Sequence, residues 1–244
     1  MDGRNILITG ASTGLGAETA AWLAKGNTIF VHYNASAEAA RNMVQIVKER
    51  GGVAHLVQAD LSKEEGCSKL FCDVRSVTDR LDVLVNNAGS GFGRYGISDI
   101  EWAVMLRIFA LNTFAVMRIT SLFVPLLEIG TNPCIVNITS VAARSGAPTA
   151  TIYGAAKGAV DTFTRGSAKE LAPRIRVNSI APGVFETPFH DSMTSKEKLA
   201  ELEQITALKR NGKPRHIALA VEFLVENDFI TGECIDVNGG LSMR

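Results

Sequence analysis

The sequence predicts one α/β domain, a Rossmann-like, doubly wound parallel sheet of about seven strands with helices on both faces. Short apolar, β-rich runs recur along the chain, and stretches with helical periodicity separate them. The runs are apolar throughout and do not alternate, which is typical of parallel strands covered by helices on both faces. A chain of 244 residues fits one such domain. We therefore expect residues 1–244 to form a single unit.

The elements alternate regularly until the sixth strand. The expected strands are 6–10, 28–33, 53–60, 81–89, 134–140, 174–183 and 233–240. The expected helices are 15–25, 36–50, 63–79, about 98–128, 151–172 and 214–226. Glycines at 51 and 52 end the second helix, and a proline begins the last. The polar segment at about 185–210 interrupts this alternation, and we expect it to be a lid or substrate loop.

Charge and composition exclude several classes of function. The chain carries 25 basic and 25 acidic residues, so it lacks the basic excess expected of proteins that bind nucleic acid or anionic membranes. The longest apolar stretch, 109–127, is interrupted by Asn112 and Arg118, which favours a buried helix over a membrane span. The first residues lead directly into an apolar run, with no room for a signal peptide. We expect a cytoplasmic protein.

The four cysteines predict neither disulfides nor a metal site. They show no CxxC spacing and no associated histidine cluster. We expect free thiols in a reducing compartment. The cysteines are Cys67, Cys72, Cys134 and Cys234.

A glycine-rich turn, TGASTGLG, follows the first expected strand. Gly10, Gly14 and Gly16 permit a tight turn that lets the backbone approach a pyrophosphate, and the next helix offers free N–H groups. The spacing GxxxGxG differs from the GxGxxG fingerprint, so a turn without a ligand is the alternative. The position between a first strand and a helix favours a nucleotide site.

The end of the second expected strand indicates the cofactor. NAD-binding domains place an acidic residue there to bind the ribose hydroxyls, whereas this chain has Tyr33, Asn34, Ala35 and Ser36. No carboxylate repels a 2′-phosphate, and Asn34 and Ser36 could donate hydrogen bonds to one. NADP(H) is therefore favoured over NAD(H), although positions 13 and 35 carry Thr and Ala and not a basic residue that could bind the 2′-phosphate. Capping of the next helix by Asn34 and Ser36 is compatible with either cofactor.

Tyr153 and Lys157 are four residues apart, so they lie on one face of the expected helix 151–172. A tyrosine has a pKa of about 10 and shuttles protons poorly at neutral pH. A nearby cation, helped by an oxidised nicotinamide, favours the phenolate and lowers this pKa. Ser140, at the end of the fifth strand, could hydrogen-bond a substrate oxygen on which charge develops. The pattern indicates a catalytic pair, with an unremarkable helix surface as the alternative.

The ordered set of motifs resembles the short-chain dehydrogenase/reductase family over essentially the whole chain. The set comprises TGASTGLG, Asp60-Leu61, NNAG at 86–89, Asn112, Ser140, YGAAK at 153–157, PG at 182–183 with Thr187, and VNGG at 237–240. The resemblance implies an NAD(P)(H)-dependent enzyme that interconverts a ketone and a secondary alcohol by hydride transfer. It also implies a homotetramer formed through the helices 98–128 and 151–172 and through the last strand with its preceding helix.

The resemblance implies a role for each catalytic position. Tyr153 would be the general acid in reduction and the general base in oxidation, and Lys157 would lower its pKa and bind the nicotinamide ribose. Ser140 would orient the carbonyl, and Asn112 would complete a water-mediated proton relay to Lys157, unless it only kinks its helix. The expected cofactor-binding residues are Gly10, Ser12, Thr13, Gly14, Leu15, Gly16, Tyr33, Asn34, Ser36, Asp60, Leu61, Asn87, Ala88, Gly89, Tyr153, Lys157, Pro182, Gly183, Val184 and Thr187.

Length and the terminal ITGECIDVNGG are similar to those of 3-oxoacyl-acyl-carrier-protein reductases. Those enzymes need basic residues near the active-site mouth to receive an acidic carrier protein. Here the segment 127–134 has no Lys or Arg and carries Glu128, although Arg174 and Arg176 remain. This composition weakens the carrier-protein hypothesis.

A sugar- or uronate-derived ketone is the alternative substrate. Arg94, Arg144, Phe189 and His190 would line such a pocket, because arginine and histidine suit a polar or carboxylate-bearing ketone. Each of these polar residues could instead be a solvated surface residue. A non-enzymatic nucleotide-binding regulator is a hypothesis of another class. Intact catalytic positions argue against it, because a sensor needs no proton shuttle.

Overall fold

The computed structural model describes residues 1–190 and 194–243, and within them it confirms the α/β fold. One parallel sheet of seven strands has the order β3-β2-β1-β4-β5-β6-β7. The strands are β1 (Asn5–Ile8), β2 (Thr28–Tyr33), β3 (Val53–Gln58), β4 (Val83–Asn86), β5 (Cys134–Ile138), β6 (Arg176–Pro182) and β7 (Cys234–Val237). The order reverses between β1 and β4, and doubly wound sheets bind ligands at the carboxyl ends of such neighbours.

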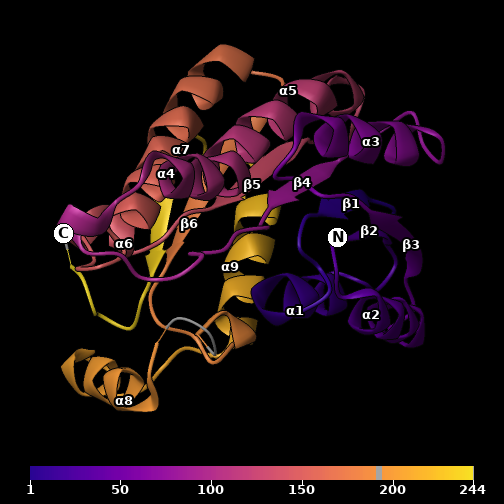
Figure 1. Ribbon diagram of the computed structural model, residues 1–244. Helices are drawn as coiled ribbons and strands as arrows, with labels where there is room; N and C mark the ends of the chain where they lie inside the picture. Colours follow the sequence, from indigo (N-terminus) through magenta and orange to yellow (C-terminus); the bar gives the residue numbers. More distant parts are fainter. Residues whose placement is uncertain (191–193, 244) are drawn as a thin grey trace.

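Helices cover both faces of the sheet (Figure 1). The α-helices are α1 (Gly14–Trp22), α2 (Ala37–Glu49), α3 (Glu64–Arg75), α4 (Trp102–Phe109), α5 (Ala115–Glu128), α6 (Ala142–Ser145), α7 (Thr151–Leu171), α8 (Lys196–Ile205) and α9 (Pro214–Glu226). α1, α2 and α9 cover one face, and α3, α5 and α7 cover the other. Ile6 and Ile8 pack toward the first layer and Leu7 toward the second, so the strand is apolar at every position.

The expected helix 98–128 is interrupted. Ile97–Asp99 forms a single 3-10 turn, η1, and a π-helical segment, η2 (Ala110–Phe114), joins α4 to α5. The run Trp102–Glu128 is long and apolar enough to cross a membrane by length and composition alone. However, half of its most apolar window is buried inside the protein, and Phe123 and Leu127 are fully buried under α3 and the sheet. The run is therefore a core helix of the domain.

The described parts of the segment after β6 include two short helical elements. A 3-10 turn, η3 (Pro188–His190), is followed by α8, which Figure 1 shows set apart from the two helical layers. Ser195 caps α8 by accepting a hydrogen bond from the N–H of Lys198 at 3.2 Å. α8 has no buried residue, so it has no apolar stripe for a sequence pattern to reveal. The four-residue α6 is too short to show a helical period in the sequence. We call residues 185–210 the lid.

Candidate active site

Glycines shape the turn between β1 and α1. Gly10 and Gly14 have φ angles of +65° and +59°, which glycine adopts without strain. A Cβ atom on Gly16 would lie 2.4 Å from the carbonyl oxygen of Gly10, so a side chain is excluded there too. Thr13 is exposed at the N-cap of α1, and its side chain makes no capping hydrogen bond. The backbone of this turn can therefore approach a phosphate closely.

The carboxyl end of β4 braces the same turn. The Asn87 Nδ2 atom donates hydrogen bonds to the carbonyl oxygens of Thr9 and Gly10, at 2.8 and 3.1 Å. The N–H groups of Asn87 and Ala88 both donate to Thr9 Oγ1, at 2.9 and 3.0 Å. The structure thus brings Asn87 and Ala88 next to the glycine turn, at the point where the strand order reverses.

A cleft of about 460 Å³ opens beside the turn. Ser12 and Gly14 line it together with residues of α1 and α2, and Glu186 and Pro188 of the lid close one side. Leu15 is half-buried and packs against the core on the α1 face. The lid and the glycine turn therefore line one end of a cleft that extends between α1 and α2, whereas the expected residues after β2, β3 and β4 do not line it.

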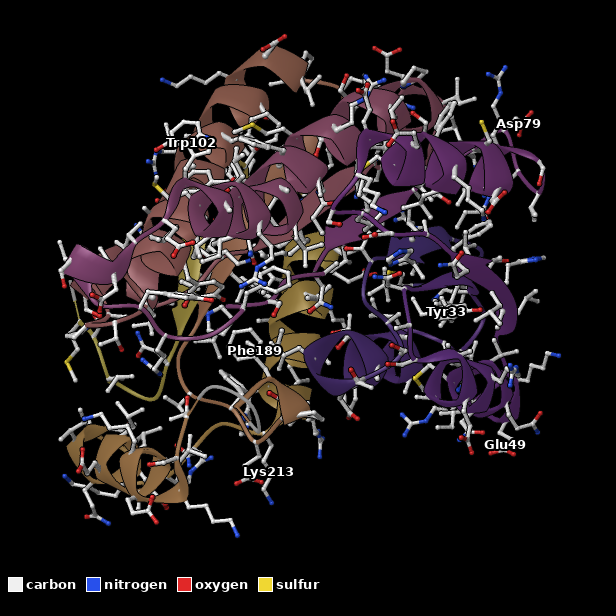
Figure 2. All side chains as sticks on the ribbon, viewed as in Figure 1. Tyr33, Glu49, Asp79, Trp102, Phe189 and Lys213 are labelled. Carbon is white, nitrogen blue, oxygen red and sulfur yellow. The ribbon has the colours of Figure 1, made fainter. Side chains whose placement is uncertain are left out.

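The end of β2 presents polar groups to solvent. Tyr33 is half-buried, whereas Asn34 and Ser36 are exposed; Figure 2 shows Tyr33 on the β2–α2 side of the molecule. Ser36 occupies the N-cap position of α2, but its side chain makes no capping hydrogen bond. The expected cap is therefore not formed by Ser36, and its hydroxyl remains available to another acceptor or donor.

Asp60 and Leu61 follow β3 with different surroundings. One Asp60 carboxylate oxygen accepts hydrogen bonds from the Ser62 hydroxyl at 2.7 Å and the Ser62 N–H at 3.1 Å. These bonds, with Lys63 nearby, lower the pKa of Asp60 although partial burial opposes them. Leu61 is buried in the core on the α3 and α5 face.

Ser140, Tyr153 and Lys157 converge at the carboxyl end of β5. Lys157 is buried on α7, and its Nζ atom donates a hydrogen bond to the carbonyl oxygen of Ile138 at 2.8 Å. The same Nζ atom lies 5.9 Å from the ring centroid of Tyr153. The hydroxyl of Ser140 hydrogen-bonds Tyr153. The three predicted side chains therefore share one site.

Burial shifts the pKa values of Tyr153 and Lys157 in opposite directions. Burial raises the pKa of Tyr153 to about 12, and the hydrogen bond with Ser140 only partly opposes it. Burial also lowers the pKa of Lys157 to about 8. Desolvation disfavours the charged form of each group, and the Lys157 ammonium is directed at the Ile138 carbonyl oxygen. At neutral pH Tyr153 keeps its proton, which is the form that a proton donor needs.

Asn112 is fully buried in the π-helical segment η2. Its Nδ2 atom donates to the carbonyl oxygens of Ile108 at 2.8 Å and Ser90 at 2.7 Å, and its Oδ1 atom accepts from the N–H of Ser90 at 3.2 Å. A Cβ atom on Gly89 would lie 2.8 Å from Asn112 Oδ1 and 3.2 Å from Lys157 Nζ. Gly89, Asn112 and Lys157 are therefore immediate neighbours, and Asn112 both shapes its helix and holds the segment after β4.

The expected nicotinamide end lies between β6 and the lid. The carbonyl oxygen of Pro182 accepts from the N–H of Val141 at 2.8 Å, which ties β6 to the segment after Ser140. The carbonyl oxygen of Val184 accepts from Gly212 at 2.8 Å, and a Cβ atom on Gly183 would meet Asn238 at 2.8 Å. Thr187 reaches the glycine turn: a Cβ atom on Gly14 would lie 3.5 Å from the Cβ atom of Thr187.

Only one of the expected substrate residues faces Tyr153 among those whose side chains the structure describes. The ring of Phe189 lies 5.8 Å from the ring of Tyr153 between centroids; Figure 2 shows Phe189 on the lid side of the molecule. A crevice beside Tyr153, with no room for a water molecule in this structure, is lined by apolar and small residues. They are Gly91, Gly93, Tyr95, Ile108, Thr149, Ala150 and Ile152.

The two arginines are engaged elsewhere. Arg94 is exposed at the rim and donates to Thr149 Oγ1 at 3.3 Å and Thr194 Oγ1 at 3.1 Å. Arg144 points toward β7 and pairs with Asp161 at 3.1 Å and Asp236 at 3.5 Å. The structure therefore does not bring Arg144 into the crevice. The side chain of His190 lies outside the described part of the chain.

His32, on β2, contacts the site, and the sequence reasoning missed it. It is 2 % exposed, and its Nδ1 atom accepts a hydrogen bond from the N–H of Gly10 at 2.9 Å. Its Nε2 atom lies 3.1 Å from the carbonyl oxygen of Ala59. The available signal was a single histidine inside the apolar run TIFVHY. Ser90 was missed because no motif marks a residue that acts through its backbone.

The residues present fit a dinucleotide. The glycine turn excludes side chains from the phosphate position, Asn34 and Ser36 are exposed at the ribose position, and Gly89 leaves space beside Lys157. The cleft runs from α1 and α2 to the lid. These groups lie at the carboxyl ends of β1, β2 and β4, in the order that an extended cofactor needs.

Comparison with known proteins decides the family. A family model described as enoyl-(acyl carrier protein) reductase matches residues 10–242. The chain belongs to the short-chain dehydrogenase/reductase family. This short-chain dehydrogenase/reductase is 35 % identical to the uncharacterized oxidoreductase YmfI of Bacillus subtilis, over 97 % of this chain and 98 % of that protein. It is 32 % identical to the 7alpha-hydroxysteroid dehydrogenase of Escherichia coli K12, over 98 % and 94 %.

A solved structure extends the likeness to the fold. The angucycline C-6 ketoreductase LanV with bound NADP superposes with a TM-score of 0.89 at 30 % identity, covering 98 % of this chain and 96 % of that one. Family membership makes this chain an oxidoreductase acting on CH–OH or C=O groups. It is thus an enzyme, and the hypothesis of a regulator without catalytic activity has no support.

Proposed function

We propose that this short-chain dehydrogenase/reductase is an NADP(H)-preferring enzyme that reduces an apolar cyclic ketone to a secondary alcohol, and oxidises the alcohol in reverse. The observation that carries the proposal is the convergence of Ser140, Tyr153 and Lys157 beside an apolar crevice. Each of these residues has a chemical task in a carbonyl reduction.

Tyr153 supplies the proton. A reduced nicotinamide, when bound, would supply the hydride to the carbonyl carbon. As the C=O double bond becomes a single bond, the oxygen takes the proton from the Tyr153 hydroxyl, and Ser140 stabilises the developing negative charge with a hydrogen bond. The phenolate left on Tyr153 lies near the Lys157 ammonium, which stabilises it electrostatically. A water-mediated relay through Asn112 would return a proton to this pair.

The cofactor preference rests on the end of β2. Exposed Asn34 and Ser36 offer hydrogen-bond donors without a carboxylate to repel the 2′-phosphate, and the similar LanV structure holds NADP. We therefore expect a lower KM for NADPH than for NADH. Asn34→Asp should reverse the preference, whereas Ser36→Ala should weaken NADPH binding and leave NADH binding unchanged. An Asn34→Asp enzyme that keeps the wild-type preference would contradict this assignment.

The substrate class follows from the crevice. Ile108, Ile152, Tyr95 and the ring of Phe189 provide apolar and aromatic walls around Tyr153, while Arg94 binds threonine hydroxyls at the rim. The similar 7alpha-hydroxysteroid dehydrogenase and the angucycline ketoreductase have polycyclic substrates by name. An apolar ring would contact these side chains more favourably than a uronate would, and the crevice must widen to admit either.

The carrier-protein alternative loses one of its two remaining basic residues, Arg176. Arg174 donates to the backbone oxygens of Glu128 and Gly130. Arg176 is buried and donates to the carbonyl oxygen of Leu224 at 2.7 Å. The Arg176 guanidinium is therefore unavailable to an acidic carrier protein, whereas Arg174 is exposed with two of its N–H groups engaged. A 3-oxoacyl thioester remains the second candidate because the chain resembles those reductases in length and in its terminal segment.

A homotetramer in the cytoplasm completes the proposal. Within the described residues, LFVPLL (122–127) contributes mainly to the core, so we expect the interface elsewhere. Apolar surface is found instead on α4 and η2, where Trp102 is 72 % and Phe114 51 % exposed. Sizing chromatography with light scattering should give the mass of four chains, and a monomer mass would contradict the assembly.

The test is the consumption of NADPH with three carbonyl compounds side by side. A decalone, a ketouronate and acetoacetyl-CoA represent the three substrate classes. We expect turnover of the decalone, with Tyr153→Phe inactive on the same substrate. Turnover of acetoacetyl-CoA alone would support the thioester candidate, and turnover of the ketouronate alone would restore the uronate hypothesis and assign Arg94 to it.

A further inference from the structure

We infer that His32 is a positioning residue for the cofactor, because it connects the glycine turn to the end of β3 and so fixes the distance between the two sides of the adenosine site. The inference rests on the proposed dinucleotide site. His32 belongs to none of the motifs by which the family resemblance was stated.

Three hydrogen bonds at His32 reach the two segments. The N–H of Gly10 donates to His32 Nδ1 at 2.9 Å, and the N–H of Ala11 donates to the His32 carbonyl oxygen at 2.8 Å. On the other side of the ring, Nε2 lies 3.1 Å from the carbonyl oxygen of Ala59. Gly10 and Ala11, the second and third residues after β1, are thus attached to His32, and so is Ala59, which precedes Asp60.

The two ring contacts specify one form of the imidazole. A backbone N–H can only donate, so Nδ1 must be the unprotonated acceptor toward Gly10. A carbonyl oxygen can only accept, so Nε2 must carry the hydrogen toward Ala59. The neutral Nε2–H tautomer meets both needs. An imidazolium would place its own N–H against the N–H of Gly10. His32 is also only 2 % exposed, and burial disfavours the positive charge.

The position of Gly10 determines the rest of the turn. Its carbonyl oxygen accepts from Asn87 at 3.1 Å, and α1 packs so closely that a Cβ atom on Gly16 would lie 2.4 Å from that oxygen. The Gly10 peptide is therefore held on its N–H side by His32 and on its oxygen side by Asn87. Releasing the N–H side lets the turn rotate relative to Asp60, which disturbs the phosphate and adenine contacts together.

The test compares side chains that keep different parts of the connection. His32→Asn places an amide oxygen near the Nδ1 position and can still accept from Gly10. His32→Leu removes both ring contacts at similar volume, and His32→Gln extends an amide toward Ala59 without an acceptor at the δ position. His55, which stacks on Phe30 from the neighbouring strand, provides the matched control as His55→Leu.

We expect His32→Leu and His32→Gln to raise the NADPH dissociation constant roughly tenfold or more, which corresponds to one buried N–H left without its acceptor. His32→Asn should recover most of the affinity. The kcat at saturating NADPH should change little in all three, because the reacting groups near Tyr153 are not touched. His55→Leu should bind NADPH like the wild type. If His32→Leu does not fold, the comparison of NADPH affinity between His32→Gln and His32→Asn tests the inference.

Two results would overturn the inference. The first is wild-type NADPH affinity in His32→Leu or His32→Gln, and the second is an Asn variant as weak as the Gln variant. Both differ from a failure of the proposed function. If the proposed function were wrong, the wild-type protein itself would bind neither NADPH nor NADH in a fluorescence titration.

Discussion

Acidification should destabilise the protein through His32. Burial lowers the pKa of this histidine from 6.5 to about 4, with a further lowering by Lys69 and an opposing effect of the hydrogen bond to Ala59. The unfolded chain therefore takes up a proton before the folded one does. Stability from this group is complete above about pH 6.5 and is lost as the pH falls toward about 4.

The magnitude follows from the two pKa values. At about 1.4 kcal/mol per pKa unit, the whole interval corresponds to roughly 3 kcal/mol, of which about 2.5 kcal/mol is lost by about pH 4.5. For a chain of this length that loss lowers Tm by roughly 5–10 °C. Carboxylates that titrate in the same range affect the wild type and variants alike. His32→Asn is the control because it keeps the acceptor for Gly10 and cannot be protonated.

The assay is urea unfolding of the wild type and His32→Asn at several values between about pH 7.5 and about pH 4.5. At about pH 7.5 the variant should be no more stable than the wild type. Between that pH and about pH 4.5, the wild type should lose about 2.5 kcal/mol more unfolding free energy than the variant does. Parallel pH dependences of the two proteins would refute the reasoning, because His32 would then titrate alike in both states.

Three substitutions test the site separately. Gly16→Ala should abolish NADPH binding in a fluorescence titration, because its Cβ atom would clash with Gly10. The control Gly166→Ala has open space around the new Cβ atom and should bind NADPH normally. Equal NADPH binding by the two variants would contradict the turn geometry. Lys157→Met should lower kcat about 100-fold or more. The same variant should have a higher Tm, since the substitution removes a buried charge. An unchanged kcat would contradict the proposed role of Lys157. Phe189→Ala should raise KM for the decalone but not for NADPH; the reverse would place Phe189 in the cofactor site.

Much of the fold could be predicted because its signals are local. Continuous apolar runs mark strands that are covered on both faces, and Ile6, Leu7 and Ile8 show this directly by packing into opposite layers. Strand ends were predicted too long: residues 87–89 leave the sheet, and Asn87 turns to brace the glycine turn instead. α8 was not predicted because an exposed helix without buried residues lacks an apolar period.

The site was predictable where chemistry needs particular residues at fixed spacing. Tyr153 and Lys157 meet because a helix repeats about every four residues, and Ser140 joins them from a strand end. Burial raises the pKa of Tyr153, an effect that spacing cannot reveal; the lowering of this pKa by Lys157 and an oxidised nicotinamide stays a prediction. Arg144 was placed in the pocket by its sequence distance from Ser140, but Asp161 and Asp236 attract it toward β7. Such tertiary ion pairs leave no local signal.

The most direct test of the central claim is the single-turnover reduction of the decalone by pre-bound NADPH in the wild type and in Tyr153→Phe. Phenylalanine keeps the ring beside Phe189 and removes only the hydroxyl that Ser140 contacts. We predict unchanged NADPH binding with a reduction rate lowered by roughly 100-fold or more. A Tyr153→Phe enzyme that reduces the ketone at the wild-type rate would contradict the account, because the proton would then come from another group.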